Sequence, residues 1–193
     1  MKIALTGWNG FLASKLRERT EIEWQEDLEN SDMLLLMGSP TFTDAELDKH
    51  DAQVMHQYVR ETIRQIDRYH KPIVFASTTG VNDIQIDHSG STCYNLGKLY
   101  IENYIVNNCD EWMILRIGTI ISDKASDIDK MRSDRVQQRL RRRDTSNIEF
   151  EDEYLFVDKF VNTTVNSLLN FKTGIVEYQL TKLTLPTLTM LGK

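Results

Sequence analysis

Apolar runs alternate along this chain with segments in which apolar residues recur at helical spacing. The runs have the length of strands and lie at residues 3–5, 33–37, 73–76, 112–117 and 175–180. Helices are predicted between and beyond them, at residues 11–19, 54–66, 94–106 and 157–168. Continuous apolar strands separated by helices are typical of a parallel sheet that is buried on both faces. The pattern therefore predicts an α/β fold with a doubly wound parallel sheet.

Length and composition limit the classes of protein to consider. The chain has 193 residues, which suits one domain when domains average about 150 residues. Hydrophobic residues make up 40% and charged residues 27%, as in ordinary globular proteins. The formal net charge of −6 does not favour nucleic acid or anionic membranes. No apolar run approaches the roughly 18 residues that cross a bilayer, so we expect neither a nucleic-acid nor a membrane partner.

The start of the chain and its cysteines predict a cytoplasmic location. The strand at Lys2–Leu5 leaves no room for a signal peptide before it. Cys93 and Cys109 are too few for a disulfide framework and lack the spacing of metal ligands. We therefore expect a reducing compartment and no bound metal.

A turn containing two glycines follows the first strand and leads into the first predicted helix. Gly7 and Gly10 allow a tight turn whose backbone N–H groups can approach a pyrophosphate, and the small Ala13 lets the helix pack close to the sheet. Ordinary turn geometry also explains two glycines here. The position of this turn in the first βα unit favours dinucleotide binding.

Hydroxyl groups and a Tyr-x-x-x-Lys pair occur later in the chain. Tyr94 and Lys98 lie one turn apart on one face of a predicted helix, where an ammonium would favour the phenolate of the tyrosine. Ser77, Thr78 and Thr79 follow the strand before this helix, so a hydroxyl there could bind the same carbonyl oxygen that the tyrosine protonates. A half-buried tyrosine, a solvated lysine and a polar turn would explain the same residues.

The order of these elements resembles the short-chain dehydrogenase/reductase superfamily, in particular its extended branch of NAD(P)-dependent nucleotide-sugar epimerases, dehydratases and reductases. Matching segments occur in the family's order at Thr6–Ala13, Asp32–Gly38, Val74–Thr78, Tyr94 with Lys98, Leu115–Gly118 and Phe156–Asp158. The resemblance implies that Thr78, Tyr94 and Lys98 are catalytic. It implies that the cofactor, NAD or NADP, contacts Gly7, Trp8, Asn9, Gly10, Phe11, Leu12, Asp27, Leu28, Gly38, Ser39, Tyr94, Lys98 and Arg116.

The chain also departs from the family. Only about a dozen residues separate the first helix from Asp32, where the family fits a second strand, a helix and a third strand. We therefore expect a shortened Rossmann-like domain over residues 1–193, in which residues 119–193 form a small substrate lobe. Glu23 is a weak candidate for the acid that binds the ribose of NAD, which leaves the choice between NAD and NADP open.

An arginine-rich segment lies in the predicted substrate lobe. Six arginines and one acid give residues 132–143 a local charge of +5. In the family this region helps to bind the nucleotide diphosphate of the substrate, a role that guanidinium groups suit. We therefore expect Arg132, Arg135 and Arg139 to bind substrate together with Thr79. A solvated helix or a basic loop explains the arginines equally well.

The resemblance implies NAD(P)-dependent oxidation, reduction or epimerisation at a sugar carbon, with a nucleotide-activated sugar favoured as substrate. The shortened adenosine region motivates an alternative, a dinucleotide-binding sensor or scaffold without efficient chemistry. The family commonly dimerises through the helix that carries the tyrosine. A homodimer could bury Leu96, Leu99, Tyr100 and Tyr104 of this chain, although packing within one subunit would bury them too.

Overall fold

The computed structural model describes residues 1–40, 49–87, 92–122 and 153–182. Six strands form one sheet in the order β2-β1-β3-β4-β5-β8, and every neighbouring pair in it is parallel. The strands are β1 (Lys2–Leu5), β2 (Glu23–Gln25), β3 (Met33–Leu36), β4 (Ile73–Thr78), β5 (Trp112–Ile117) and β8 (Gly174–Glu177). The predicted α/β fold with a parallel sheet is confirmed.

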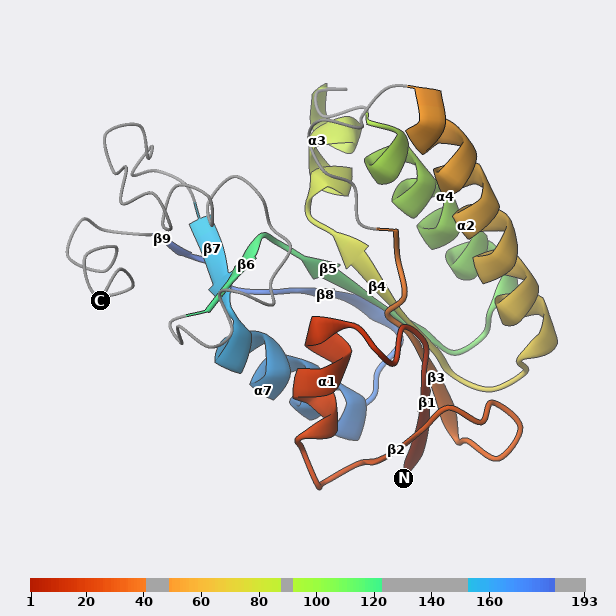
Figure 1. The fold of residues 1–193 in the computed structure, drawn as a ribbon, viewed down its shortest axis with the longest axis vertical. Coiled ribbons are helices and arrows are strands. Elements are labelled where there is room, and N and C mark those ends of the chain that lie inside the picture. The colour runs from red at the N-terminus through yellow and green to blue at the C-terminus, as the bar shows by residue number, and fades with distance from the viewer. Residues whose placement is uncertain (41–48, 88–91, 123–152, 183–193) are drawn as a thin grey trace.

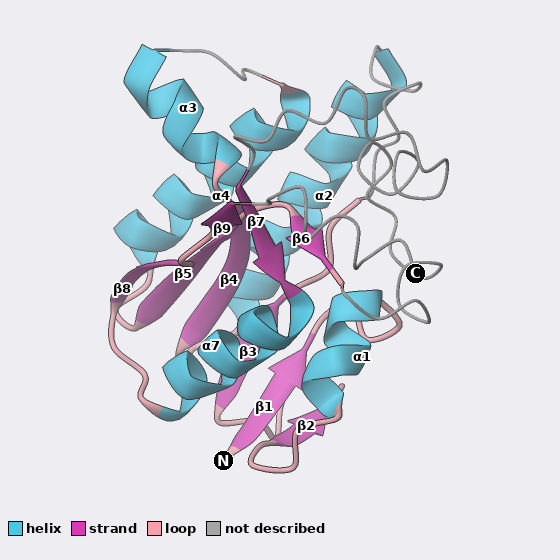
Figure 2. Cartoon of the chain, turned by 90° about the vertical axis from the view of Figure 1, so that its left-hand side faces the viewer, coloured by secondary structure: helices cyan, strands magenta, loops and turns pink. Residues whose placement is uncertain are grey.

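Helices cover both faces of the sheet (Figures 1 and 2). One face carries α1 (Phe11–Arg17) and α7 (Val157–Leu169), and the other carries α2 (Lys49–Arg68) and α4 (Cys93–Asn108). A further helix, α3 (Gly80–Asp87), follows β4 and packs against α4. The sheet is therefore doubly wound, as predicted. Within the described ranges, every helix is too short or too polar to pass through a bilayer.

The central strands β1 and β3 are apolar at every buried position because successive residues enter two different cores. Ile3 and Leu5 of β1 pack beneath α1 and α7, whereas Ala4 between them packs beneath α2 and α4. In β3, Leu35 belongs to the first core, and Leu34 belongs to the second. Side chains alternate across a strand, so a strand covered on both faces has no position for a polar residue in its middle.

Three short strands form a second sheet in the order β6-β7-β9. They are β6 (Ile120–Ile121), β7 (Glu153–Phe156) and β9 (Thr181–Lys182), with β7 parallel to β6 and antiparallel to β9. All three fall within the predicted substrate lobe. That region also supplies α7 and the edge strand β8 to the main fold, and its treatment as a lobe stays a prediction.

Some elements differ from the sequence expectation. The position beside β1 is filled by β2, so the shortened segment before Asp32 keeps one of the strands that it was expected to lose. The strand β4 continues two residues beyond the prediction because Ser77 and Thr78 still pair with β5. The strand β8 ends at Glu177, before the predicted limit at residue 180. The polar helix α3 was not predicted.

The strand order reverses between β1 and β3, and two turns meet at this point. The chain leaves β1 for β2 on one side and then crosses to β3 on the other. Gly7 has a φ of 69°, and a Cβ atom there would lie 2.7 Å from Cα of Gly38, which follows β3. The hydroxyl oxygen of Thr6 accepts hydrogen bonds from the backbone N–H groups of Met37 at 3.0 Å and Gly38 at 3.1 Å. In parallel α/β sheets, ligands bind beyond the carboxyl ends of the strands at such a reversal.

Replacing Gly7 with alanine should destabilise the protein strongly. The positive φ is unfavourable for alanine, and the added methyl group would collide with the backbone of Gly38. We expect the free energy of unfolding, measured with urea, to fall by about 2–4 kcal/mol. Gly10→Ala is the control, because Gly10 has a φ of −73° and its added Cβ would meet only the carbonyl oxygen of Gly7, at 3.0 Å. Equal losses in the two variants would contradict the assigned cause.

Candidate active site

The predicted cofactor turn is accessible at the reversal point. Gly7, Asn9 and Gly10 are exposed. Trp8 is half-buried, and the guanidinium carbon of Arg17 lies 4.3 Å from the centre of its indole ring. Arg17 also donates a hydrogen bond to the carbonyl oxygen of Trp8 at 3.2 Å. These contacts hold one side of the turn and leave its glycine backbone open to a ligand.

The other predicted residues of the first helix and of the following loop have structural contacts. Phe11 and Leu12 pack against the core beneath α1 and α7, and Leu28 packs against the opposite core. The carboxylate of Asp27 accepts hydrogen bonds from the backbone N–H of Glu29 and the side chain of Asn30. These hydrogen bonds, the one from Asn30 foremost, lower the pKa of Asp27. The cofactor contacts of these predicted residues stay predictions.

The end of β2 lies where the ribose of a dinucleotide would be expected. This strand ends in Gln25, whose buried side-chain nitrogen has no hydrogen-bond partner among the described residues. Glu23, the weak candidate for binding ribose, lies at the other end of the strand and forms an ion pair with Lys2 at 3.5 Å. Glu23 is therefore excluded from this edge. An unpaired donor at Gln25 and an open glycine turn fit an NAD(P) molecule, and they leave the choice between NAD and NADP open.

Helix α4 brings Tyr94 and Lys98 to the same edge. The helix begins after Thr92, whose side chain accepts a hydrogen bond from the backbone N–H of Asn95 at 3.2 Å. The side chain of Ser39 lies close enough to that of Tyr94 to lower the pKa of the phenol. Ser39 follows Gly38 directly, so the predicted catalytic helix lies beside the loop that packs against the cofactor turn.

Lys98 is almost completely buried between α4 and β4. Its ammonium donates hydrogen bonds to the carbonyl oxygen of Ala76 at 2.8 Å and to the hydroxyl oxygen of Tyr58 at 3.1 Å. It also lies 4.7 Å from the ring centre of Phe75 and 5.6 Å from that of Tyr94. Burial lowers the pKa of Lys98 to about 7, against the opposing effect of the Glu102 carboxylate.

The pKa of Tyr94 does not follow the sequence expectation. Burial raises it, and the interaction with Ser39 offsets only part of that increase. The expected lowering by Lys98 is not seen, because removal of Tyr94 from water disfavours the phenolate more strongly. Tyr94 is therefore a neutral phenol in this structure and can donate a proton.

Thr78 and Thr79 connect β4 to α3 at the same edge. The Thr78 side chain accepts a hydrogen bond from the backbone N–H of Gly80 at 3.3 Å. The backbone N–H of Thr79 donates to the carbonyl oxygen of Ile117 at 3.1 Å. Both side chains are half-buried. The hydroxyl of Thr78 can still donate its proton to a substrate oxygen.

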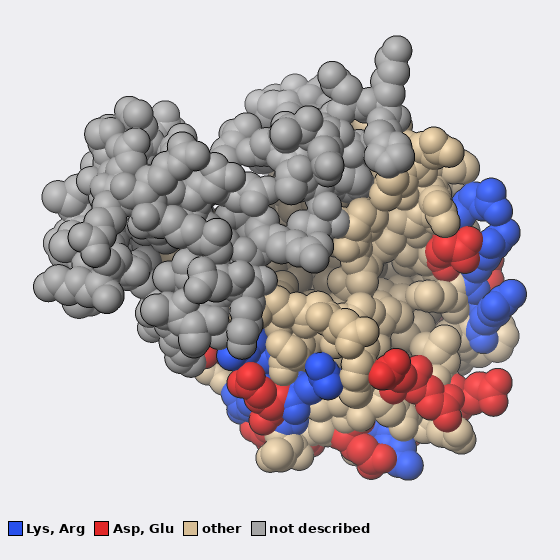
Figure 3. Space-filling view, viewed as in Figure 1, with Lys and Arg blue, Asp and Glu red and all other residues tan. Residues whose placement is uncertain are grey.

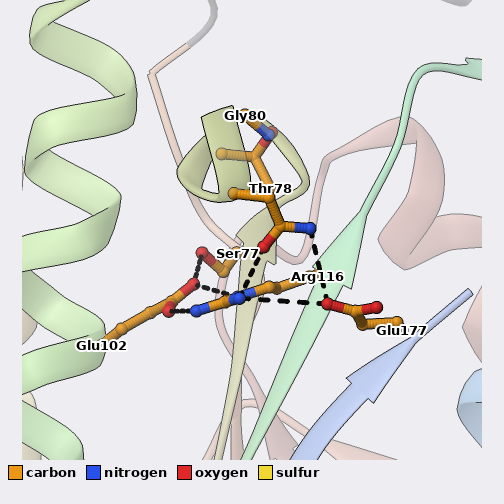
Figure 4. A network of polar contacts seen from close by, with 7 residues as sticks. Ser77, Thr78, Gly80, Glu102, Arg116 and Glu177 are labelled. Atoms are coloured by element: carbon orange, nitrogen blue, oxygen red, sulfur yellow. Dashed lines mark hydrogen bonds and ion pairs between the residues drawn. The ribbon is translucent and has the colours of Figure 1, made fainter. Parts of the chain in front are cut away.

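A buried polar network lies behind Thr78 (Figure 4). Arg116 on β5 donates two hydrogen bonds to the carboxylate of Glu102 on α4, at 3.3 and 2.7 Å. Ser77 on β4 also donates to this carboxylate. The remaining terminal nitrogen of Arg116 donates to Asn82 on α3 at 2.5 Å and lies 3.9 Å from Glu177 on β8. The network thus ties five elements together beneath the carboxyl edge.

This network gives Arg116 protein partners that the sequence did not predict. The sequence resemblance assigns Arg116 to the cofactor, but its guanidinium is buried and bound by Glu102, Asn82 and Glu177. Its contact with a cofactor stays a prediction. Glu102 and Tyr58 were not singled out from the sequence. Glu102 could have been found as an acid one helical turn after Lys98, on the same face of α4.

The remaining predicted residues and the surface charges add little to the description of this site. Arg132, Arg135 and Arg139 lie outside the described residues. Within the described ranges, no group of His, Cys, Asp and Glu side chains is arranged to hold a metal ion. Figure 3 shows lysines and arginines interspersed with acids along the margins of one face.

The buried amine of Lys98 should make stability depend on pH. The folded protein holds this proton with a pKa of about 7, below the ordinary value of 10.5, so between these values the unfolded chain binds more protons. Stability should therefore rise with pH across this window, by up to about 1.4 kcal/mol per pH unit, relative to a Lys98→Met variant. Urea unfolding of both proteins at several pH values measures the difference. The exposed Lys71→Met variant is the control, and parallel curves for wild type and Lys98→Met would contradict the assignment.

The sequence matches no protein-family model, and no curated protein is similar enough to it to serve as a relative. Solved structures do share its fold. RMD from Pseudomonas aeruginosa, complexed with NADPH, has a TM-score of 0.64 at 12% identity, over 94% of this chain and 80% of that protein. A hypothetical dTDP-4-dehydrorhamnose reductase from Sulfolobus tokodaii has a TM-score of 0.64 at 18% identity, over 98% and 81%.

A short-chain dehydrogenase/reductase superfamily protein from Agrobacterium tumefaciens with bound NAD has a TM-score of 0.66 at 15% identity, over 94% of this chain and 79% of that protein. Similarity at such low identity establishes the fold alone. The chain therefore has the Rossmann-like α/β fold of short-chain dehydrogenases/reductases, as the sequence resemblance implied.

Proposed function

We propose that this protein is an NAD(P)-dependent oxidoreductase or epimerase that acts on a sugar carbon, with a nucleotide-activated sugar as substrate. The placement of the Tyr94 phenol beside the Ser39 side chain carries the proposal. It brings the proton donor on α4 to the loop after β3, whose Gly38 packs against the glycine turn after β1. The proton donor and the dinucleotide turn therefore belong to one site. A cytoplasmic location, expected from the sequence, is part of this proposal.

NAD or NADP is the cofactor that fits this edge. The glycine turn is exposed at the reversal of strand order, and the side-chain nitrogen of Gln25, which has no partner in the described part of the chain, lies at the end of β2. Structures with the same fold hold NADPH or NAD. The bound dinucleotide would supply or accept the hydride.

The side chains of this chain would handle the proton and the substrate oxygen. Tyr94 donates its phenolic proton to a carbonyl oxygen during reduction and takes a proton from a hydroxyl during oxidation. Lys98, when protonated, stabilises the phenolate that remains after donation and holds the nicotinamide ribose. Thr78 hydrogen-bonds the same substrate oxygen and orients it. Raising the pKa of Tyr94 by burial keeps the phenol protonated until the substrate oxygen is ready to accept.

A nucleotide-activated sugar is the proposed substrate for two reasons. The structural neighbours include a hypothetical dTDP-4-dehydrorhamnose reductase and a UDP-glucuronic acid 4-epimerase from Bacillus cereus. The arginines of residues 132–143, with Arg132, Arg135 and Arg139 among them, would suit its diphosphate. Thr79, just before α3, would contact the sugar.

Replacing Tyr94 with phenylalanine should abolish turnover without abolishing cofactor binding. Calorimetric titration with NADH and NADPH measures binding, and a panel of nucleotide sugars with each cofactor measures turnover. We expect kcat on a competent substrate to fall by about 10²–10⁴-fold, because no other group replaces the phenol. Tyr104→Phe is the control, since Tyr104 bonds to Asp67 away from this edge.

Full turnover in Tyr94→Phe would refute the mechanism. Cofactor binding without turnover across the whole panel would favour the alternative, a dinucleotide sensor. The burial of Arg116 in an ion pair with Glu102 supports this alternative, because Arg116 was expected to contact the cofactor.

A homodimer through α4 is also part of the proposal. Leu96, Tyr100 and Val106 are exposed on this helix, whereas Leu99 and Tyr104 are half-buried within the subunit. Sedimentation equilibrium should give twice the mass of the 22.5 kDa chain. A Tyr100→Glu variant should be monomeric, because a charge in an apolar interface loses its hydration. A monomeric wild-type protein would refute the dimer.

A further inference from the structure

We propose that Tyr58, on α2, is a positioning residue that holds the ammonium of Lys98 in place beside Tyr94. The inference rests on the proposed function in so far as Lys98 takes part in catalysis. The ring of Tyr58 packs against the core beneath α2 and α4. Its hydroxyl adds a polar contact that packing alone does not require.

The close packing of α2 against α4 brings Tyr58 to Lys98. Gly97 of α4 lies beneath Met55 of α2, and a Cβ atom at Gly97 would be 2.5 Å from the terminal methyl carbon of Met55. Tyr58 follows Met55 by about one helical turn, and Lys98 is the next residue after Gly97. The absence of a side chain at position 97 therefore lets the Tyr58 hydroxyl reach the buried ammonium.

Tyr58 supplies a side-chain acceptor to Lys98. An ammonium has three N–H donors, and two of them go to the Ala76 carbonyl oxygen and to the Tyr58 hydroxyl oxygen, at 2.8 and 3.1 Å. The nearby carboxylate of Glu102 is bound by Arg116 and Ser77. Within the described ranges the third donor of Lys98 has no hydrogen-bond partner and remains for a ligand, and its direction is set by the two bonds already made.

Tyr58 is itself fixed and uncharged. Burial raises the pKa of Tyr58, and the side chain of Thr62, one turn further along α2, offsets only part of that increase. Thr62 is buried. A neutral, anchored oxygen orients the ammonium and favours its protonated form without cancelling its charge.

The Tyr58→Phe variant tests the proposal in the protein without ligand. The titration of Lys98 is followed by NMR of protein labelled with [13Cε]lysine, and the Lys98 signal is the one missing from Lys98→Met. Loss of the acceptor should shift the Lys98 midpoint to lower pH. Tyr69→Phe is the matched control, because it removes a tyrosine hydroxyl that bonds to Ser31 at 2.8 Å, away from Lys98.

An unchanged Lys98 midpoint in folded Tyr58→Phe, or an equal shift in Tyr69→Phe, would overturn the proposal. If Tyr58→Phe does not fold, Thr62→Val replaces it, since loss of the Thr62 hydroxyl that influences Tyr58 should shift the midpoint in the same direction. No shift in Thr62→Val would then overturn the proposal.

Turnover separates this inference from the proposed function. With a competent substrate, Tyr58→Phe should lower kcat at least tenfold at neutral pH while changing KM less, and the loss should shrink at lower pH as Lys98 regains its proton. A loss of kcat that is the same at every pH would overturn the positioning role. If neither NADH nor NADPH binds the wild type while the Lys98 midpoint still shifts in Tyr58→Phe, the proposed function fails and the Tyr58–Lys98 contact stands.

Discussion

Burial of three charged side chains in one layer, behind the carboxyl edge of the sheet, governs the arrangement of this site. Lys98, Glu102 and Arg116 are all nearly inaccessible to water. Unpaired charges at such positions are costly, so each must find partners within the fold. Glu102 and Arg116 satisfy each other and recruit Ser77, Asn82 and Glu177 from three further elements. The position of α4 over β4 and β5 is fixed by this requirement, and Tyr94 is carried on the same helix.

The charge of Lys98 is compensated by different partners, and this difference affects how readily the amine gains and loses its proton. Glu102 lies one turn away on α4, but its oxygens are already engaged by Arg116, and its attraction for Lys98 only partly offsets the loss of hydration. The result is an amine that gains and loses its proton near neutral pH. A buried lysine of this kind can stabilise a phenolate when it is charged. Structural ion pairs and a titratable lysine thus coexist on one helix because they use different partners.

Much of this arrangement is local and could be predicted from the sequence. The strands β1 and β3 are apolar at every buried position, and β4 and β5 are apolar at most of theirs. The glycine turn and the Tyr94–Lys98 pair each span only a few residues of sequence. The edge strand β2 was missed because only Trp24 of its three residues is apolar. Tyr58 and the partners of Arg116 were missed for another reason. Their roles depend on how α2 packs on α4 and on how β5 aligns with α3, neither of which is encoded by local spacing.

The neutral hydroxyl of Tyr58 suits the ammonium of Lys98 better than a carboxylate or an apolar side chain would. A carboxylate at the position of the Tyr58 hydroxyl would neutralise the ammonium, and a phenolate forming on Tyr94 would then gain little from it. An apolar side chain there would leave the ammonium with one protein acceptor and shift the amine toward its neutral form. A neutral hydroxyl avoids both outcomes, since it accepts one hydrogen bond and leaves the positive charge intact. Because burial disfavours ionisation of Tyr58 itself, the charge of Lys98 is not neutralised by this acceptor and stays available to Tyr94, whose ring centre lies 5.6 Å away.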